Sequence, residues 1–430
     1  MAPLKVLVVG AGIAGNATSF WLAKLGHSVT VIERHNELRT NGLQLDLRGH
    51  GIAVMRHMGL EQAVREKCVP EEGVALVDST GRQRAFFAAN KTGKGAQSMT
   101  SEFEIMRKDL CLLLHDASVE YGAKYVFSTT VESYREDGKG IQVKFANGST
   151  RTETFDLVVG CDGQGSRIRR LMLADGDAAA AEEEKILVTL PERFGYYTID
   201  RPMQEGEKYI ATGYLMPDKR FVLTRRHLPD KMQVYFRCEA NDGPMDGVKK
   251  GDVKAEKEAF AEIFQNGGWQ TDELVKALRE GGEDFYCQYT GFIKLDEWSR
   301  GHVTLVGDAG YGCPPDGFGT SMALVGAYVL AGEVQRHRAG SDGNDGISAA
   351  LSAYQTEFQP YMSSLQKGYS AEPSFFDKIP WNTWTVSFAN NLAAIVSMLN
   401  LDKVAARFMP ASDDEKGWKP PLYQISVRAQ

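Results

Sequence analysis

The stretch Leu4–Glu33, LKVLVVGAGIAGNATSFWLAKLGHSVTVIE, decides the fold of the chain around it. It begins with a short apolar run of the kind that forms a strand buried on both faces. Gly10, Gly12 and Gly15 follow with the GxGxxG spacing, which allows a tight turn, a close approach of backbone N–H groups to a phosphate, and close packing of the next helix. A second apolar run ends in Glu33, placed to bind an adenosine ribose. These features predict a βαβ unit that binds the pyrophosphate of a dinucleotide.

The same glycine spacing also occurs in ordinary turns, so its surroundings matter. Here a buried strand precedes the glycines, a helix is predicted over about residues 13–25, and an acidic residue ends the second strand. Because a carboxylate favours two free ribose hydroxyls over a 2′-phosphate, the unit suits NAD or FAD. The motif alone does not choose between these two.

Length and composition indicate an ordinary globular protein of two or three connected domains, because 430 residues exceed one compact core. The net charge of −7 argues against a broad nucleic-acid or anionic-membrane surface. The six cysteines are scattered without CxxC or His/Cys ligand spacing, so we expect no metal site, no disulfide framework and a cytoplasmic location. No apolar run reaches the roughly 18 residues of a membrane span, and the early start of the βαβ unit leaves no room for a signal peptide.

Two further glycine-bearing stretches follow buried strands later in the chain. The run 155–160 leads into Cys161-Asp162-Gly163, and the run 303–306 leads into Gly307-Asp308. Asp-Gly by itself indicates only a turn, but its position directly after a buried strand favours a role in a site. The second stretch continues through a rigid proline pair and more glycines to a long apolar helix, so another helix N-terminus meets a glycine loop.

Between these two stretches the chain alternates polar and apolar residues in the manner of strands. Four such runs predict a curved antiparallel sheet that could form the wall of a pocket, and two helices are predicted after it, over about residues 254–265 and 271–280. Near the C-terminus, Trp381–Leu401 reads as a helix packed on the body of the protein, with a membrane-surface or lid role as the alternative. The four predicted strands are 196–199, 209–215, 220–225 and 232–237.

The three motifs in this order and separation resemble the group A FAD-dependent aromatic monooxygenases, which share the p-hydroxybenzoate hydroxylase fold. The resemblance covers about residues 4–370. Within that family, NGLQLDLRGHGIAVMRHM at 41–58, followed by Met106–Leu110, looks most like the tetracycline-inactivating enzymes and related natural-product monooxygenases.

The resemblance implies an α/β fold: a Rossmann-like FAD-binding domain, a substrate domain with a mixed or antiparallel curved sheet, and C-terminal helices. The predicted FAD-binding domain is discontinuous and consists of residues 1–75, 100–185 and 285–370. The predicted substrate domain consists of residues 76–99 and 186–284, and residues 371–430 form the C-terminal helical segment.

The resemblance also assigns roles along the chain. The first three glycines would cradle the FAD pyrophosphate, Glu33 would bind the ribose, Arg107 would reach the diphosphate or ribityl region, and Asp308 would bind the ribityl chain. Gly317–Thr320 would present N–H groups to the flavin ring, and Arg39 matches an arginine that meets NADPH. The predicted cofactor-binding residues are Gly10, Gly12, Gly15, Glu33, Arg34, Arg39, Asp46, Arg107, Asp162, Asp308, Pro315, Gly317, Gly319 and Thr320.

For the reaction, the resemblance implies an enzyme that uses FAD, transient NADPH (NADH as the alternative) and O2. It would hydroxylate or epoxidise an electron-rich aromatic or polycyclic small molecule through a flavin C4a-hydroperoxide, in secondary metabolism or the inactivation of foreign compounds. Because the terminal oxygen of that species is electrophilic, the protein needs no side-chain nucleophile. We expect a monomer or a homodimer with no nucleic-acid partner.

A residue that stabilises a substrate phenolate could come from the curved sheet, where Tyr197 and Arg225 are the candidates of choice and Tyr235 and Arg193 are further ones. Each of them could equally be an ordinary core or surface residue, because strand residues alternate between faces. Two other functions stay open: a flavin-dependent halogenase or reductase on the same fold, and a flavin-binding protein without turnover. The tryptophan-rich segment expected of a halogenase does not match Ile379–Trp384 in order or spacing.

Overall fold

The computed structural model describes residues 2–38, 42–91, 100–146, 152–173, 186–240, 243–313, 317–339, 346–367, 369, 380–399 and 417–425. The predicted roles of Arg39 and Pro315 fall outside these residues.

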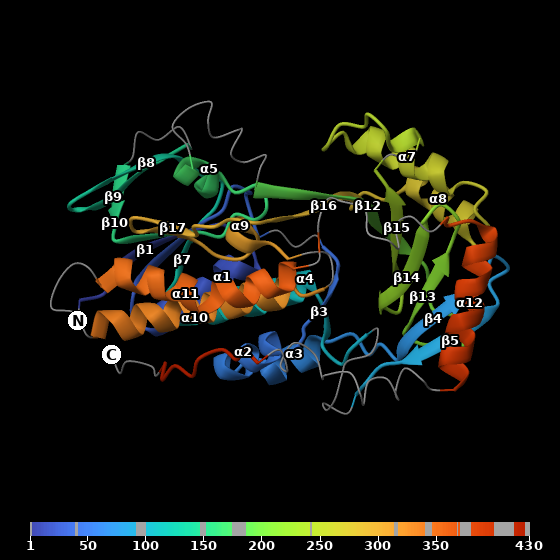
Figure 1. Ribbon diagram of the computed structural model, residues 1–430, viewed down its shortest axis with the longest axis horizontal. Helices are drawn as coiled ribbons and strands as arrows, with labels where there is room; N and C mark the ends of the chain where they lie inside the picture. The colour runs from blue at the N-terminus through green and yellow to red at the C-terminus, as the bar shows by residue number, and fades with distance from the viewer. Residues whose placement is uncertain are drawn as a thin grey trace.

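A six-stranded sheet lies at the centre of one half of the molecule (Figure 1), in the order β17-β18-β11-β1-β2-β7. Every neighbouring pair is parallel except β17 with β18. Because both faces of its centre are covered, the inner strands β1 and β11 are apolar runs rather than alternating ones, as the sequence of β1 predicted. The strands are β1 (Lys5–Val9), β2 (Ser28–Ile32), β7 (Lys124–Val126), β11 (Leu157–Gly160), β17 (Ser299–Arg300) and β18 (Val303–Leu305).

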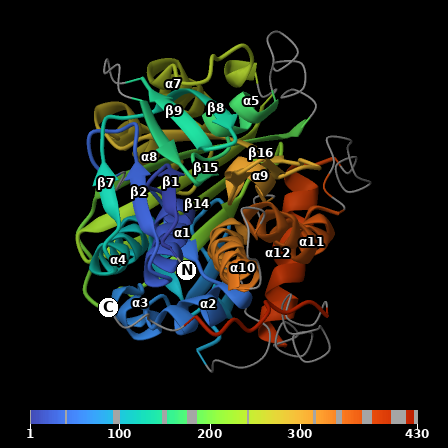
Figure 2. The same cartoon turned by 90° about the vertical axis from the view of Figure 1, so that its left-hand side faces the viewer.

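Helices pack beside one another along this sheet: α4 contacts α1, α1 contacts α10, and α10 contacts both α11 and α2 (Figure 2). The helices of this half are α1 (Ile13–Lys24), α2 (His50–Met58), α3 (Glu61–Lys67), α4 (Arg107–Glu120), α5 (Arg167–Leu173), α9 (Asp308–Tyr311), α10 (Gly319–Ala339) and α11 (Gly346–Gln366). Two small antiparallel sheets add β8 (Val131–Asp137), β9 (Gly140–Phe145) and β10 (Thr152–Phe155), and β3 (Gln44–Asp46) with β6 (Glu104–Met106).

A seven-stranded sheet forms the other half, in the order β16-β12-β15-β14-β13-β4-β5. One face packs on α7 and α8, and α12 packs on β5 at the far edge (Figure 1). Its strands are β4 (Gly73–Val77), β5 (Gln83–Ala88), β12 (Leu187–Asp200), β13 (Ile210–Leu215), β14 (Phe221–Leu228), β15 (Lys231–Glu239) and β16 (Tyr286–Ile293). The helical segments are η1 (Gly243–Met245), α7 (Val253–Phe264), α8 (Thr271–Glu280) and α12 (Thr383–Met398).

The predicted fold class is confirmed, with a parallel βαβ sheet, a second mostly antiparallel sheet and helices near the C-terminus. The largest local difference is β12, which begins at Leu187 rather than near residue 196. Pro191 and Glu192 interrupt the apolar alternation there, so the sequence hides the first half of the strand. The strand β16 belongs to the seven-stranded sheet, although the predicted division placed its segment with the FAD-binding domain. The domain boundaries stay a prediction. Within the described part of the chain, no helix has the length and hydrophobicity to span a membrane.

Candidate cofactor and active site

The three glycine motifs meet at one edge of the six-stranded sheet. The strands β1, β2, β11 and β18 are parallel, so their carboxyl ends point to the same side. Gly10, Glu33 and Cys161 come directly after the first three of these strands, and Gly307 comes two residues after β18. In open parallel sheets, ligands bind outside these carboxyl ends.

Glycines bring the motifs into direct contact. Gly10 has a φ of +102°, and a Cβ atom there would lie 2.6 Å from the carbonyl oxygen of Cys161. A Cβ atom at Gly15 would lie 1.8 Å from the carbonyl oxygen of Gly10, and one at Gly307 would lie 2.9 Å from the Cβ atom of Ala14. Any side chain at these positions would therefore push the loops apart.

Gly12, in contrast, faces open space: no heavy atom of the described residues lies within 4 Å of a Cβ atom built there. It is the N-cap of α1, and no described side chain caps that helix, so its first N–H groups are available to an anion. Beside this loop, the Glu33 carboxylate accepts hydrogen bonds from the N–H groups of Ala11 (2.9 Å) and His35 (3.0 Å). The exposed Arg34 follows Glu33. These placements suit the predicted pyrophosphate and ribose roles.

The carboxylate of Asp162 caps helix α5. It accepts hydrogen bonds from the N–H groups of Arg167 (2.6 Å) and Ile168 (3.2 Å) and from the Ser166 hydroxyl (2.5 Å). Burial raises its pKa, whereas these hydrogen bonds lower it. The buried Arg169 then donates to the carbonyl oxygen of Ala309 (2.8 Å), which joins the second motif to the third. In this structure Asp162 holds the second loop in shape.

Asp308 has a different setting at the start of α9. The residue keeps contact with solvent, yet desolvation by the surrounding protein raises the pKa of its carboxyl group, and the positive charge of Arg107 opposes that rise. Arg107 begins α4, and its aliphatic chain lies against Gly42. An accessible carboxylate near an arginine, among the three loops, suits a polar ligand chain such as ribityl.

The third motif begins helix α10 at Gly319, after Gly317 with its φ of +89°. Arg48 lies against this segment. Its backbone N–H donates to the Ser321 hydroxyl (2.9 Å), and its guanidinium lies 5.9 Å from the centre of the Phe318 ring. Thr320 is half-buried in the first turn of α10. A positive side chain therefore stands at the segment predicted to face the flavin ring.

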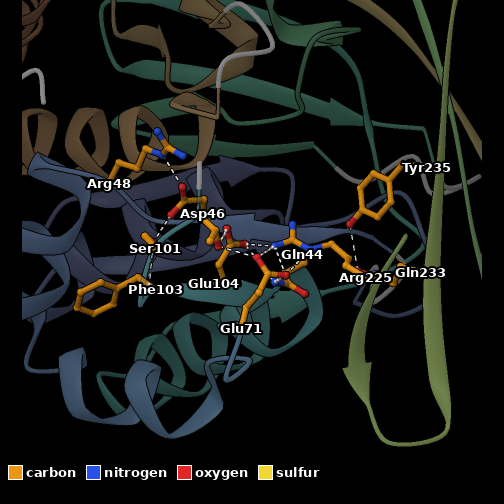
Figure 3. A network of polar contacts seen from close by, with 11 residues as sticks. Gln44, Asp46, Arg48, Glu71, Ser101, Phe103, Glu104, Arg225, Gln233 and Tyr235 are labelled. Atoms are coloured by element: carbon orange, nitrogen blue, oxygen red, sulfur yellow. Dashed lines mark hydrogen bonds and ion pairs between the residues drawn. The ribbon is translucent and has the colours of Figure 1, made fainter. Parts of the chain in front are cut away.

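A row of polar side chains runs from Arg48 to the seven-stranded sheet (Figure 3). Arg48 pairs with Asp46 on β3, and Asp46 also accepts a hydrogen bond from Ser101. Burial, and then the nearby charge of Glu104, raise the pKa of Asp46 to about 6, although Arg48 opposes the rise. The next member, Gln44, donates to Glu104 at 3.2 Å. Burial and Glu104 thus disfavour the ionised form of Asp46, and Arg48 favours it.

Arg225 of β14 ends the row and is held by two buried carboxylates. Its Nε and Nη2 atoms lie 2.7–2.9 Å from the oxygens of Glu71, and Nη2 lies 3.1 Å from Glu104. Thr100 donates to both glutamates, at 2.6 and 3.0 Å. These bonds tie the seven-stranded sheet to the β3–β6 pair. The phenol of Tyr235 lies near Arg225 and donates to Gln233 (3.0 Å).

Tyr197 does not lie with Arg225, and its position gives no support to the predicted catalytic role. It is buried on the face of the sheet that packs on α7 and α8, and its hydroxyl donates to the carbonyl oxygen of Leu274 (2.9 Å). The pairing of Tyr197 with Val234 and of Arg225 with Gln233 puts them on opposite faces. Arg193 also lies on the helix-covered side, where it stacks on Tyr289 at 4.5 Å.

The sequence interpretation missed three charged residues of the polar row, Arg48, Glu71 and Glu104, and its neutral members Gln44, Thr100 and Ser101. Glu104 had a signal, because it is a charged residue that interrupts the apolar run from Phe103 to Met106. Arg48 stands two residues after Asp46 and could have been named with it. Glu71 had no local signal. Among the described residues, no group of His, Cys, Asp or Glu has the arrangement of a metal site.

These residues fit FAD: an open glycine loop at a helix N-terminus, an acidic residue beyond β2, and a second helix N-terminus across the loops. Comparison with known proteins agrees. Residues 3–209 match the FAD binding domain family model. The chain is 38% identical to the FAD-dependent monooxygenase asL4 of Sarocladium schorii over 98% of this chain and 99% of the relative, and 31% identical to the flavin-dependent monooxygenase eupH of Phoma sp over the full length of both.

Among solved structures, the tetracycline destructase Tet(55) superposes with a TM-score of 0.72 and 26% identity, covering 98% of this chain and 99% of that one. The chain belongs to the FAD-dependent monooxygenases, and FAD is its cofactor.

Proposed function

We propose that this monooxygenase uses NADPH, with NADH as the alternative, and O2 to hydroxylate or epoxidise an electron-rich aromatic or polycyclic small molecule. A role in secondary metabolism or in the inactivation of foreign compounds follows from the same proposal, because asL4 and eupH are fungal monooxygenases and Tet(55) is a tetracycline destructase.

The observation that carries the proposal is an aromatic surface on the face of the seven-stranded sheet that α7 and α8 leave uncovered. Tyr196 stacks on Phe194 at 5.9 Å and on Tyr286 at 6.4 Å, and Tyr235 meets Tyr196 edge-to-face at 5.0 Å. Arg225 lies on the same face and connects through the polar row to Arg48, beside α10. A flat aromatic ring would gain stacking contacts on such a surface.

Bound FAD supplies the activation of oxygen, and the chain supplies position and electrostatics. The N–H groups at the start of α1 would hold the pyrophosphate. The N-terminus of α10, with Arg48 beside it, would stabilise negative charge on the pyrimidine side of the flavin. The aromatic face would hold the substrate ring and exclude water from it.

The test uses the purified protein with its FAD and a panel of polyphenols. NADPH oxidation should accelerate when a substrate is added, and the product should gain one oxygen atom that carries label from ¹⁸O2. A halogenase or reductase would leave the product unlabelled. A protein without turnover would show no bleaching of its flavin by NADPH under nitrogen. Either result would reject the proposal.

The variant Gly12→Ala tests separately whether the glycine loop before α1 binds FAD. Because nothing described lies near that position, the thermal stability of the apoprotein should stay unchanged, while FAD affinity should fall at least about tenfold when a methyl group takes the room beside the phosphate. Gly138→Ala, also in open space but in the β8–β9 turn, is the matched control and should bind FAD normally. Unchanged FAD affinity in Gly12→Ala would contradict the predicted role of this loop.

A further inference from the structure

Arg225 is a guanidinium on the aromatic face, where an anionic substrate could contact it, but its charge is already paired with two carboxylates. Two hydrogen-bonding atoms of its guanidinium contact Glu71, and one of these also reaches Glu104. Both carboxylates are almost fully buried, at 2% and 3% exposure. Carboxylates held in this way do not leave for a ligand, because an unpaired buried charge costs several kcal/mol.

The whole row carries more negative than positive charge. Three carboxylates (Asp46, Glu71 and Glu104) stand against two guanidiniums (Arg48 and Arg225). Gln44, Thr100 and Ser101 are neutral and donate hydrogen bonds to the carboxylates. The row therefore places one excess negative charge beside the aromatic face. Because the row is buried, water screens this charge only weakly, and it repels another negative charge several ångströms away.

We propose that this row makes the substrate pocket selective for an uncharged aromatic, such as a phenol, ester or ketone, and disfavours an aromatic carboxylate or phenolate. The inference rests on the proposed function, which places the substrate on this face. It revises the predicted role of Arg225: the residue positions the sheet against the β3–β6 pair and does not neutralise a substrate anion. Glu71 and Glu104 are the residues that set the specificity.

The next residue on the same strand provides a matched control. Arg226 is held by Glu207 through bonds of 2.6 and 3.0 Å, a geometry similar to that of Arg225 with Glu71. It points to the opposite face, because Arg226 pairs with Met232 and Arg225 with Gln233. Glu207 lies between β12 and β13 and binds the sheet through Arg226, so Glu207→Gln removes one carboxylate charge at the opposite face.

The experiment measures binding to the FAD-loaded protein from the change in the flavin visible spectrum, without NADPH. The probes are matched pairs of a hydroxylated benzoate and its methyl ester, with two fused rings in one pair and a single ring in another. A buffer of about pH 8 keeps Asp46 ionised, since its pKa is raised to about 6. Wild type should bind the ester at least about tenfold more tightly than the acid. Glu71→Gln and Glu104→Gln should each reduce that ratio severalfold, and Glu207→Gln should leave it unchanged.

The possible results distinguish a failure of this inference from a failure of the proposed function. If wild type binds the acid as tightly as the ester, the inference is overturned and the proposed function is not. The same holds if neither Glu71→Gln nor Glu104→Gln changes the ratio of the two affinities. An equal reduction in Glu207→Gln also overturns it, because the effect would then come from charge anywhere on the sheet. If no aromatic of either kind perturbs the flavin of a fully loaded protein, the proposed function fails as well. FAD content of each variant shows that the fold is intact.

Discussion

The two faces of the seven-stranded sheet are built from the same strands and have different roles. On the face toward α7 and α8, Phe236 stacks on Phe264 at 4.2 Å, and Tyr197 is buried beside them. On the other face, Tyr235 lies beside Arg225, the end of the polar row that begins at Arg48 (Figure 3). One face is a dry core, and the other combines aromatic rings with buried charge.

The comparison teaches that neighbouring residues on these strands have unrelated roles. Tyr196 and Tyr197 are adjacent, as are Arg225 and Arg226, yet each pair divides between core and candidate site. Side chains alternate along a strand, so a shift of one position changes the solvent, the partners and the charge around a residue. Residue type alone therefore carries little functional information here. The predictions below test the two faces against each other.

The largest effect is expected for Phe236→Ala on the core face. Phe236 is fully buried, so its loss should lower the free energy of unfolding by about 4 kcal/mol, measured by urea denaturation. Leu223→Ala is the control on the other face, because Leu223 pairs with Tyr235 and is only half-buried. It should cost about 1 kcal/mol. A loss as large for Leu223→Ala would show that both faces are equally packed.

A smaller effect, with a defined pH dependence, is expected at Asp46. Its folded pKa of about 6 lies above the usual value of about 3.9, so the folded state binds the proton more tightly. This contribution is fully present below about pH 4 and is lost as the pH rises through 6. Relative to Asp46→Asn, wild type should lose about 1.4 kcal/mol of unfolding free energy between about pH 5 and pH 8.

Glu207 supplies the contrast for that measurement. Burial alone would raise its pKa, but the hydrogen bonds from Arg226 lower it below its usual value. Its contribution is therefore present above about pH 4.3 and is lost only as the pH falls further. The difference between wild type and Glu207→Gln should stay constant from about pH 5 to pH 8. A parallel drift in both variants would mean that Asp46 is not the titrating group.

The sequence predicted the parts of this molecule that are local. Gly10 to Glu33 form a strand, turn, helix and strand in succession, so their spacing alone indicates the loop and its acidic neighbour. Helices α7 and α8 were likewise predicted to within one residue, because their apolar periodicity is regular. The family resemblance placed the three motifs around one cofactor, and the structure gives the physical reason: a parallel sheet brings its strand ends to one edge.

The candidate substrate face could not be predicted in the same way. Choosing between Tyr197 and Arg225 requires knowing which face α7 and α8 cover, and both faces carry aromatic and charged residues. Glu71 and Arg225 are 154 positions apart, and Glu71 lies outside any periodic element. A buried ion pair of this kind arises from tertiary packing, so the sequence contains no spacing that would indicate it.

The smallest effects are expected when single tyrosine hydroxyl groups are removed. One variant on each face should then change a different quantity, the unfolding free energy or the KM. Tyr197→Phe removes the buried side-chain hydrogen bond to the Leu274 carbonyl, so the free energy of unfolding should fall by about 1 kcal/mol with the KM of an aromatic substrate unchanged. Tyr235→Phe removes a hydroxyl beside Arg225 on the proposed substrate face, and should raise that KM about threefold to tenfold. Both variants keep the ring, so packing is preserved. If Tyr197→Phe changed the KM and Tyr235→Phe did not, the substrate would bind on the helix-covered side, and the assignment of the two faces would have to be exchanged.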